Sequence, residues 1–290
     1  LVASLAREHV TVCLSGDGGD EAFGGYNRYF IGTRLWQKMN RLPTSLRQIL
    51  SRMLLSVPPE RWNCLIGAVS GLLPARVRFG NPGDKLHKLA GVLGVTGAEA
   101  FYHGLVSHCA DPARFVIDSI EPRTLVTDLA RWPALPDFAS RMMAVDAQSY
   151  LTDDILCKVD RAAMSVSLEI RVPYLDHRLV EFAWRLPLDM KLREGQGKHI
   201  LRQVLYRYVP KELIERPKMG FGVPIDSWLR GPLKEWAEEL LDEGRLRREG
   251  YFNPRPIRQK WAEHLSGKRN WQYHLWDVLM FQSWLEENKS

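Results

Sequence analysis

The pattern of apolar and polar residues predicts a mostly helical chain with one clear strand near its beginning. The run VTVCL before Ser15 is short and apolar, which is typical of a strand. Beyond it, residues 30 to 110 carry helical patterns such as SLRQILSRMLLSVP, which are interrupted by prolines and by the segment GNPGD. We therefore expect many helices and few strands.

A longer amphipathic pattern predicts one helix over residues 146–167. Asp154, Lys158 and Arg161 fall together on one face, at steps of four and three residues. The apolar residues recur at helical spacing on another face: Leu151, Ile155, Val159, Ala162 and Val166.

The segment EIRVPYLD, which follows this helix, is predicted to be extended, because Pro173 keeps the residue before it out of the helical region. Asp176 is then placed to cap the helix HRLVEFAWRL. A further helix, GKHILRQVLYRYV, is expected to run as far as Pro210, and the loop RPKMGFGVP follows it.

The C-terminal part is predicted to be helical and rich in tryptophan. In PLKEWAEELL the proline occupies a first-turn position that a helix tolerates. The segment NWQYHLWDVLMFQSWLEE predicts a last helix whose apolar stripe packs in the core: Trp271, Leu275, Val278, Leu279 and Trp284.

Composition is that of a soluble globular protein. The 290 residues are 45% hydrophobic and 26% charged, enough for one large domain or two small ones. The net charge of +6 suits anionic partners, but no long block of lysine and arginine occurs. No apolar run is long enough to cross a membrane, so we expect no membrane partner.

The cysteines predict a reducing compartment. The chain has four of them, Cys13, Cys64, Cys109 and Cys157, without metal-binding or CxxC spacing. We interpret them as buried, reduced thiols of a cytoplasmic protein. The chain starts at Leu1 inside the apparent end of a helix, so we expect it to be a piece of a longer protein.

The stretch VCLSGDGGDEAFGGYNRY is the strongest candidate for a functional site. A strand that ends in a glycine-rich turn is a usual place for a phosphate or a nucleotide, because backbone N–H groups can approach the ligand closely. Two common nucleotide motifs are excluded. GDGGDE is followed by Ala22 and Phe23 instead of the P-loop lysine, and Glu21 stands where a dinucleotide fingerprint needs glycine.

Three acids in this stretch suggest a metal ion: Asp17, Asp20 and Glu21. Carboxylates repel a polyphosphate unless a hard cation lies between them, and Mg²⁺ held by one or two carboxylates and by phosphate oxygens is the usual arrangement. An acidic helix start is the alternative interpretation of Asp20 and Glu21. The paired glycines on both sides and the preceding strand favour a functional site.

The stretch SGDGGDEAFGGYNRY resembles the second nucleotide-site motif of the glutamine-dependent asparagine synthetase family. Matching segments follow in the same order: LTDDILCKVDRAAMSVSLEIRVPYLDHRLVEFAWRLP, GKHILR and ERPKMGFGVPID. The resemblance spans nearly the whole chain, although residues 40–130 match only loosely. It implies an α/β parent fold similar to the adenine nucleotide alpha-hydrolases. Residues 1–290 would be the predominantly α-helical C-terminal part of its synthetase domain.

The resemblance also implies a reaction. The family's synthetase domain uses ATP and Mg²⁺ to adenylate the side-chain carboxylate of aspartate, and ammonia from glutamine then displaces AMP to give asparagine. The family's upstream SGGxDS loop and its glutaminase domain, with an N-terminal cysteine, are absent from this sequence. We therefore expect the glutaminase domain to be a partner within a longer chain and the isolated 290 residues to be inactive. The sequence leaves the oligomeric state open, with a homodimer as one option.

Roles follow for the residues that match the motifs. Asp20 would bind Mg²⁺, with Glu21 less certain. The family often has glutamate at position 17, so the role of the shorter Asp17 is open. The residues expected to line the nucleotide and acyl-adenylate site are Ser15, Gly16, Asp17 and Gly18.

Two lysines and a charged pair complete the predicted site. Lys198 in GKHILR and Lys218 in RPKMGFG would contact the phosphates and the leaving pyrophosphate, so the predicted catalytic residues are these lysines and Asp17. Asp160 and Arg161 are further nucleotide-site candidates. A solvated salt-bridge face is the alternative for that helix. Structural or substrate-side roles are open for Glu169 and Arg171, and Tyr26 is expected to pack beside the loop.

Other functions compete with this one. Relatives that activate a carboxylate for another acceptor include β-lactam synthetases, lasso-peptide cyclases and synthetase-like proteins encoded with exopolysaccharide genes. A non-catalytic binding module is the alternative from another class, with RQVLYRYVPKELIERPK as a nucleic-acid surface. It is less favoured, because the aromatic and basic residues there follow helical packing periods. We expect no nucleic-acid partner.

Overall fold

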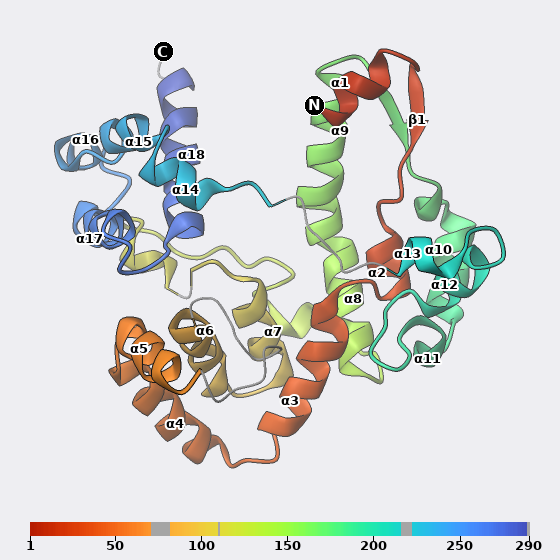
Figure 1. The fold of residues 1–290 in the computed structure, drawn as a ribbon, viewed down its shortest axis with the longest axis horizontal. Coiled ribbons are helices and arrows are strands. Elements are labelled where there is room, and N and C mark those ends of the chain that lie inside the picture. Colours follow the sequence, from red (N-terminus) through yellow and green to blue (C-terminus); the bar gives the residue numbers. More distant parts are fainter. Residues whose placement is uncertain (71–81, 110, 216–221, 289–290) are drawn as a thin grey trace. The chain divides into compact units, whose positions relative to one another are not determined.

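The computed structural model describes residues 1–70, 82–109, 111–215 and 222–288 of the chain (Figure 1). The chain forms two compact units, each built from two separate segments. Unit 1 consists of Leu1–Arg41 and Arg123–Lys218, and unit 2 of Leu42–Pro122 and Met219–Ser290. Within the described ranges the fold is mostly helical with two short strands, as the sequence predicted.

Unit 1 contains both strands. β1 (Val12–Leu14) and β2 (Glu169–Arg171) pair in parallel, with Cys13 opposite Ile170. The helical elements of this unit are α1 (Val2–Arg7), α2 (Gly19–Phe23), η1 (Arg28–Gly32), α3 (Thr33–Met39), η4 (Leu129–Arg131), α8 (Phe138–Gln148), η5 (Leu151–Leu156), α9 (Cys157–Met164), η6 (Pro173–Leu175), α10 (His177–Arg185), α11 (Leu188–Lys191), α12 (His199–Leu205) and α13 (Lys211–Ile214).

The short helix α2 is the centre of unit 1. It packs against α8, α10 and α12, and Figure 1 shows α10 and α12 beside it. Ala22 and Phe23 of α2 are buried with Ala183 of α10, and Tyr174 packs against them. Asp176 caps α10 as predicted, because its carboxylate accepts a hydrogen bond of 2.9 Å from the Arg178 backbone N–H.

The single helix predicted over residues 146–167 is wrong. α8 ends at Gln148, a π-helical stretch, η5, follows over Leu151–Leu156, and α9 begins at Cys157. Asp146 therefore belongs to α8, where its side chain is buried. Wider helical turns of this kind change the direction of side chains without breaking the apolar periodicity, so the pattern did not reveal the two boundaries.

Helices are the regular secondary structure of the described residues of unit 2, apart from an isolated antiparallel bridge between Val116 and Phe252. Its elements are α4 (Thr44–Ser56), α5 (Pro59–Ser70), α6 (Pro82–Leu93), α7 (Ala98–Val106), η3 (Pro112–Arg114), α14 (Ile225–Arg230), α15 (Lys234–Leu240), α16 (Glu243–Glu249), α17 (Pro254–Leu265) and α18 (Gln272–Asn288). A core of buried apolar side chains joins α14 to α18, with Trp261 and Leu279 at 1% and 0% exposure.

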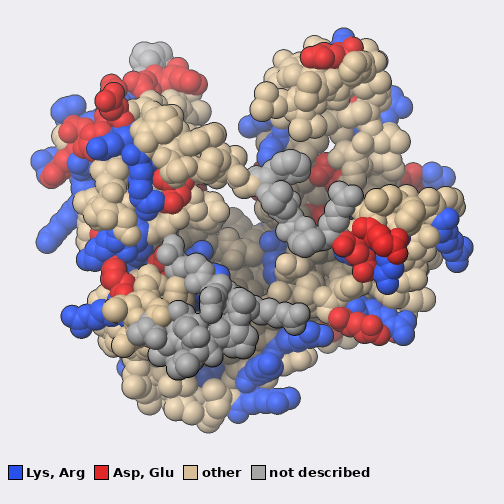
Figure 2. All heavy atoms as spheres, in the orientation of Figure 1, with Lys and Arg blue, Asp and Glu red and all other residues tan. Residues whose placement is uncertain are grey.

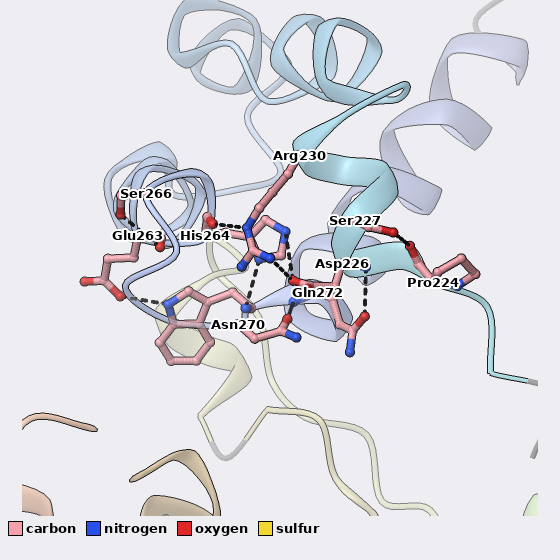
Figure 3. A network of polar contacts seen from close by, with 10 residues as sticks. Pro224, Asp226, Ser227, Arg230, Glu263, His264, Ser266, Asn270 and Gln272 are labelled. Atoms are coloured by element: carbon pink, nitrogen blue, oxygen red, sulfur yellow. Dashed lines mark hydrogen bonds and ion pairs between the residues drawn. The ribbon is translucent and has the colours of Figure 1, made fainter. Parts of the chain in front are cut away.

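A polar network holds the start of α14 against the end of α17 (Figure 3). Arg230 Nη1 lies 2.7 Å from Asp226 Oδ1, and Arg230 Nε donates to the His264 carbonyl at 2.7 Å. His264 is fully buried, and its Nδ1 accepts from the Trp271 N–H at 3.2 Å. Burial, with Arg230 nearby, lowers the pKa of His264, so the ring is neutral at pH 7.

Several sequence predictions need correction. The helix predicted for GKHILRQVLYRYV is shorter, since α12 covers only His199–Leu205. Pro232 precedes α15 instead of lying in its first turn, because the N-cap is Leu233. Trp284 is 57% exposed, whereas Leu275, Val278 and Leu279 of the same stripe are buried. The cysteines are free but not buried: three are half-buried and Cys64 is exposed.

No helix in the described part of the chain combines the length and the hydrophobicity that a bilayer crossing requires. Acidic and basic side chains are interspersed over most of the face drawn in Figure 2.

Candidate active site

The glycine-rich loop lies at the carboxyl end of the two-stranded sheet in unit 1. The Ser15 N–H donates to the Arg171 carbonyl at 2.9 Å, so the ladder between β1 and β2 continues one residue into the loop. Ser15 Oγ donates to Asp17 Oδ2 at 2.5 Å, which ties the Asp17 carboxylate to its own turn. Ligands of open parallel sheets usually bind at this end of the strands.

Two glycines shape the loop. Gly18 has a φ of 76°, and a Cβ on it would lie 2.4 Å from the Leu175 side chain. It is also the N-cap residue of α2, so the acidic Asp20 and Glu21 fall in the first helical turn. Gly24 ends the helix with a φ of 70°. Both ends of α2 therefore depend on left-handed backbone that glycine adopts without strain.

The structure brings Lys198 to Asp20. Lys198 Nζ lies 3.1 Å from Asp20 Oδ2, and the two side chains are 29% and 30% exposed. The Lys198 backbone N–H also donates to the Phe23 carbonyl at 3.0 Å. A predicted phosphate contact and a predicted metal ligand are thus neighbours at the edge of one loop.

The close approach of Lys198 to Asp20 requires glycine in both of the chain segments that meet there. A Cβ on Gly25 would lie 1.8 Å from Asp20 Oδ1 and 2.5 Å from Lys198 Cε. A Cβ on Gly197 would lie 2.1 Å from the Gly24 carbonyl oxygen. Lys198 itself has a φ of 58°, which is rare for a residue with a side chain. The backbone is therefore bent against its preference at the residue that delivers the ammonium.

The surroundings of the Asp20 carboxylate are compatible with a bound Mg²⁺. The carboxylate of Asp20 already faces a cation, the Lys198 ammonium, and part of it is open to solvent. Within the described residues, no group of three or more acidic, histidine or cysteine side chains could hold a metal ion alone. Mg²⁺ bound with a nucleotide needs only one or two protein carboxylates, because phosphate and water oxygens complete its shell.

The other predicted residues lie in different situations. Lys218 falls outside the described residues. Asp160 and Arg161 are exposed on α9, and no hydrogen bond or ion pair among the described residues links them to the loop. Lys158 and Asp154 form an exposed ion pair of 3.9 Å on the same stretch, as a solvated face would. Arg171 Nε donates to Glu169 Oε1 at 2.8 Å, so these two side chains pair with each other.

A buried network behind the loop was missed by the sequence analysis. Tyr26 donates through its hydroxyl to Glu21 Oε1 at 2.8 Å, and Glu21 is only 2% exposed. Burial raises the pKa of Glu21, and burial together with the Glu21 carboxylate raises the pKa of Tyr26. Arg28 and Tyr29 both contact the buried Asp146. The run GGYNRY contains three of its members, Tyr26, Arg28 and Tyr29. No sequence pattern links them to Asp146, which is more than a hundred residues later.

A separate cavity in unit 2 contains none of the predicted residues. It has a volume of about 320 Å³ and is lined by two ion pairs, Asp226 with Arg230 and Asp84 with Arg269, and by the loop over residues 265–270. Both of its carboxylates are paired with arginines, and Lys268 is a further cation in its lining.

Comparisons with known proteins agree on one family. The sequence model of the family described as asparagine synthase matches residues 1–286. "Asparagine synthetase [glutamine-hydrolyzing] 1" of Bacillus subtilis is 31% identical over 98% of this chain and 41% of its own length. A putative asparagine synthetase of Mycobacterium bovis is 34% identical over 98% of this chain and 40% of its own length.

A human relative matches a smaller part. "Asparagine synthetase [glutamine-hydrolyzing]" of Homo sapiens is 31% identical over 44% of this chain and 25% of its own length. The chain therefore spans about two fifths of the bacterial relatives it matches along nearly all of its length. No solved structure matches the chain.

Proposed function

The chain belongs to the asparagine synthase family, and on that premise we propose that it carries part of the site where ATP activates a carboxylate before an amide bond forms. The proposed substrates are aspartate, ATP and ammonia derived from glutamine, and the products are asparagine, AMP and pyrophosphate. The observation that carries the proposal is the Lys198–Asp20 pair at the glycine-rich loop. It joins a cation suited to phosphate with a carboxylate suited to Mg²⁺.

The proposed chemistry needs positive charge near the phosphates. Attack of the aspartate carboxylate on the α-phosphorus breaks the bond to the β-phosphate oxygen, and pyrophosphate leaves with additional negative charge. Lys198 would neutralise that charge, with Lys218 as a second predicted cation. Asp20 would hold Mg²⁺, which supplies further neutralisation when it is bound with ATP. Glycine at position 16 would leave room for the nucleotide beside the strand end, since the nearest atom to a Cβ there, on Tyr174, is 4.0 Å away.

The wider context is part of the same proposal. We infer an α/β parent fold of the adenine nucleotide alpha-hydrolase type, supported by the parallel β1–β2 pair and the loop at its carboxyl end. Residues 1–290 would form the C-terminal part of the synthetase domain, with a glutaminase domain as partner. Asp160 and Arg161 stay candidates for nucleotide contacts. The free cysteines support a cytoplasmic location.

Exchange of labelled pyrophosphate into ATP tests the proposal. The complete gene product should catalyse this exchange only when aspartate and Mg²⁺ are present, and Lys198→Met should reduce it by about two orders of magnitude. Exchange that depends on a different carboxylic acid would show that this protein activates another substrate, as some relatives of the family do. No exchange with any carboxylic acid would contradict the proposed function.

Formation of the amide is tested separately. With aspartate, ATP and ammonium, the complete gene product should form asparagine and AMP in equal amounts, measured by mass spectrometry. Glutamine should replace ammonium if a glutaminase domain supplies the nitrogen. Formation of the adenylate without asparagine would support activation and contradict ammonia as the acceptor.

A further inference from the structure

Asp146 is a buried carboxylate on α8 that holds the segment following the glycine-rich loop. Its side chain is 1% exposed. Its Oδ2 accepts hydrogen bonds from Arg28 Nε at 2.8 Å and from the Tyr29 hydroxyl at 2.6 Å, and Arg28 Nη2 lies at 2.8 Å. A buried charge is tolerated only when it is paired and hydrogen-bonded, so these contacts fix Arg28 and Tyr29 against α8.

Arg28 passes this restraint to Tyr26. The guanidinium carbon lies 4.3 Å from the centre of the Tyr26 ring and 5.0 Å from that of Tyr150. The two rings meet edge to face, with centres 5.9 Å apart. Because Asp146 engages Arg28 through Nε and Nη2, the orientation of the guanidinium plane is set, and the rings that pack on it are oriented in turn.

Tyr26 completes the connection to α2. Its hydroxyl donates to Glu21 Oε1 at 2.8 Å, and Glu21 is the residue immediately after Asp20. Successive residues of a helix point in directions about 100° apart. With Glu21 held inside, Asp20 is directed to the side where Lys198 lies.

The backbone of α2 supplies little restraint of its own. The helix has five residues, and the residues at its two ends, Gly18 and Gly24, have φ values of 76° and 70°. Glycine permits many other conformations at such positions. The side-chain contacts of Glu21 therefore act together with the buried Ala22 and Phe23 to hold the rotation of α2 about its axis.

We propose that Asp146 is a positioning residue of the ATP site: acting through Arg28, Tyr26 and Glu21, it sets the direction in which Asp20 presents its carboxylate. The proposal rests on the proposed function, because it concerns the residue predicted to bind Mg²⁺. It adds a connected set of residues that lies behind the glycine-rich loop.

The test uses the complete gene product and the complex of Mn²⁺ with α,β-methylene-ATP, whose affinity is measured by electron paramagnetic resonance. Tyr26→Phe removes one hydroxyl and should weaken binding about tenfold, the usual effect of losing a partner behind a metal ligand. Its thermal midpoint should fall, because the buried Glu21 carboxylate loses a hydrogen-bond donor, so the affinity is measured well below that midpoint. The control is Tyr206→Phe, which also loses a Tyr–Glu hydrogen bond of 2.8 Å, to Glu215, but an exposed one outside this network.

A double-mutant cycle distinguishes positioning from general weakening of the fold. Asp146→Asn and Tyr26→Phe should each reduce Mn²⁺–nucleotide affinity, and the double variant should be little weaker than Asp146→Asn alone. Asp137→Asn, at the N-cap of the same helix, should leave the affinity unchanged, since asparagine caps equally well. If Asp146→Asn does not fold, Arg28→Lys takes its place in the cycle.

The outcomes separate the two proposals. If the unmodified protein binds no Mn²⁺–nucleotide complex, the proposed function fails and the positioning role fails with it. If the unmodified protein binds the complex and Tyr26→Phe binds it equally well, only the positioning role is overturned. Strictly additive losses in the cycle would also overturn it, because they would show that Asp146 does not act through Tyr26.

Discussion

The ammonium of Lys198 and the carboxylate of Asp20 lie 3.1 Å apart because two glycines, Gly25 and Gly197, allow their loops to meet. The two residues come from different ends of unit 1's sequence, and each is delivered by a short helix with little restraint from its own backbone. The geometry of the proposed ATP site therefore depends on close backbone contact more than on extended secondary structure.

Gly25→Ala should open the ion pair and leave the fold intact. The added methyl group would overlap the ends of two flexible side chains, Asp20 and Lys198, which can move away. We expect a stability loss of less than about 1 kcal/mol and about tenfold weaker binding of MgATP. Chemical denaturation and equilibrium binding on the complete gene product measure the two effects.

The control for this substitution is Gly91→Ala in α6, where a Cβ would meet nothing within 4 Å. It should stabilise the protein by about 0.5–1 kcal/mol, because alanine favours a helix interior. Unchanged MgATP binding in Gly25→Ala would contradict the importance of the close approach.

The left-handed backbone of Lys198 predicts an unusual order of stabilities. Its φ is 58°, a conformation that costs a residue with a Cβ about 1–2 kcal/mol. Lys198→Gly should therefore be more stable than Lys198→Ala by about 0.5–1 kcal/mol, after allowance for the greater freedom of glycine in the unfolded chain. Both variants should lose pyrophosphate exchange alike. Equal stability of the two variants by urea unfolding would argue against the strained backbone.

Lys191 predicts a pH dependence of stability. The side chain is 3% exposed, with Nζ 4.8 Å from the centre of the Trp184 ring, and burial lowers its pKa to about 8. The unfolded chain, with a pKa near 10.5, binds the proton more tightly, so the free energy of unfolding should rise between pH 8 and pH 10.

Lys191→Met isolates this effect. At pH 7 the variant should be more stable than the unmodified protein by about 1–3 kcal/mol, because it buries no charge. The difference should shrink as the pH rises to 10. Urea unfolding at several pH values measures it, and a difference independent of pH would show that Lys191 is not buried as a charged group.

Truncation of two tryptophans should change stability to very different extents. Trp261 is 1% exposed in the core of unit 2, and its indole N–H donates to Glu238. Trp261→Ala should cost about 3–5 kcal/mol. Trp284→Ala should change stability by less than about 0.5 kcal/mol, since that side chain is 57% exposed. Comparable losses for both, by thermal unfolding, would contradict the exposure of Trp284.

Local patterns predicted the elements that depend on neighbouring residues. The strand before Ser15 and the cap at Asp176 follow from an apolar run and from capping chemistry, and both are present. The segment EIRVPYLD, predicted to be extended, is a strand only over Glu169–Arg171, and Pro173–Leu175 form a short 3₁₀ helix instead. The boundary between α8 and η5 did not follow, because the apolar periodicity continues through both. Trp284 was wrongly predicted to be buried for a related reason. Periodicity identifies the apolar face of a helix, but it does not show how far along the helix other elements pack against that face.

The candidate site was predictable only where a motif carried it. The loop acids and Lys198 were predicted because their segments match the family's motifs. The structure adds the distance between Lys198 Nζ and Asp20 Oδ2, which is 3.1 Å. Asp146 was not predicted, because its partners, Arg28 and Tyr29, are over a hundred residues away and a single buried aspartate has no signature in a sequence. Long-range pairing of buried polar groups depends on tertiary structure alone.

The division of each unit into two chain segments has a consequence during synthesis. Unit 1 needs both Leu1–Arg41 and Arg123–Lys218, and the first segment of unit 2 is made between them. When Asp20 leaves the ribosome, Lys198 has not yet been translated, so the early segment must wait while most of the polypeptide is produced. Expression of either half of residues 1–290 alone would leave each unit without one of its two segments, and the product should aggregate.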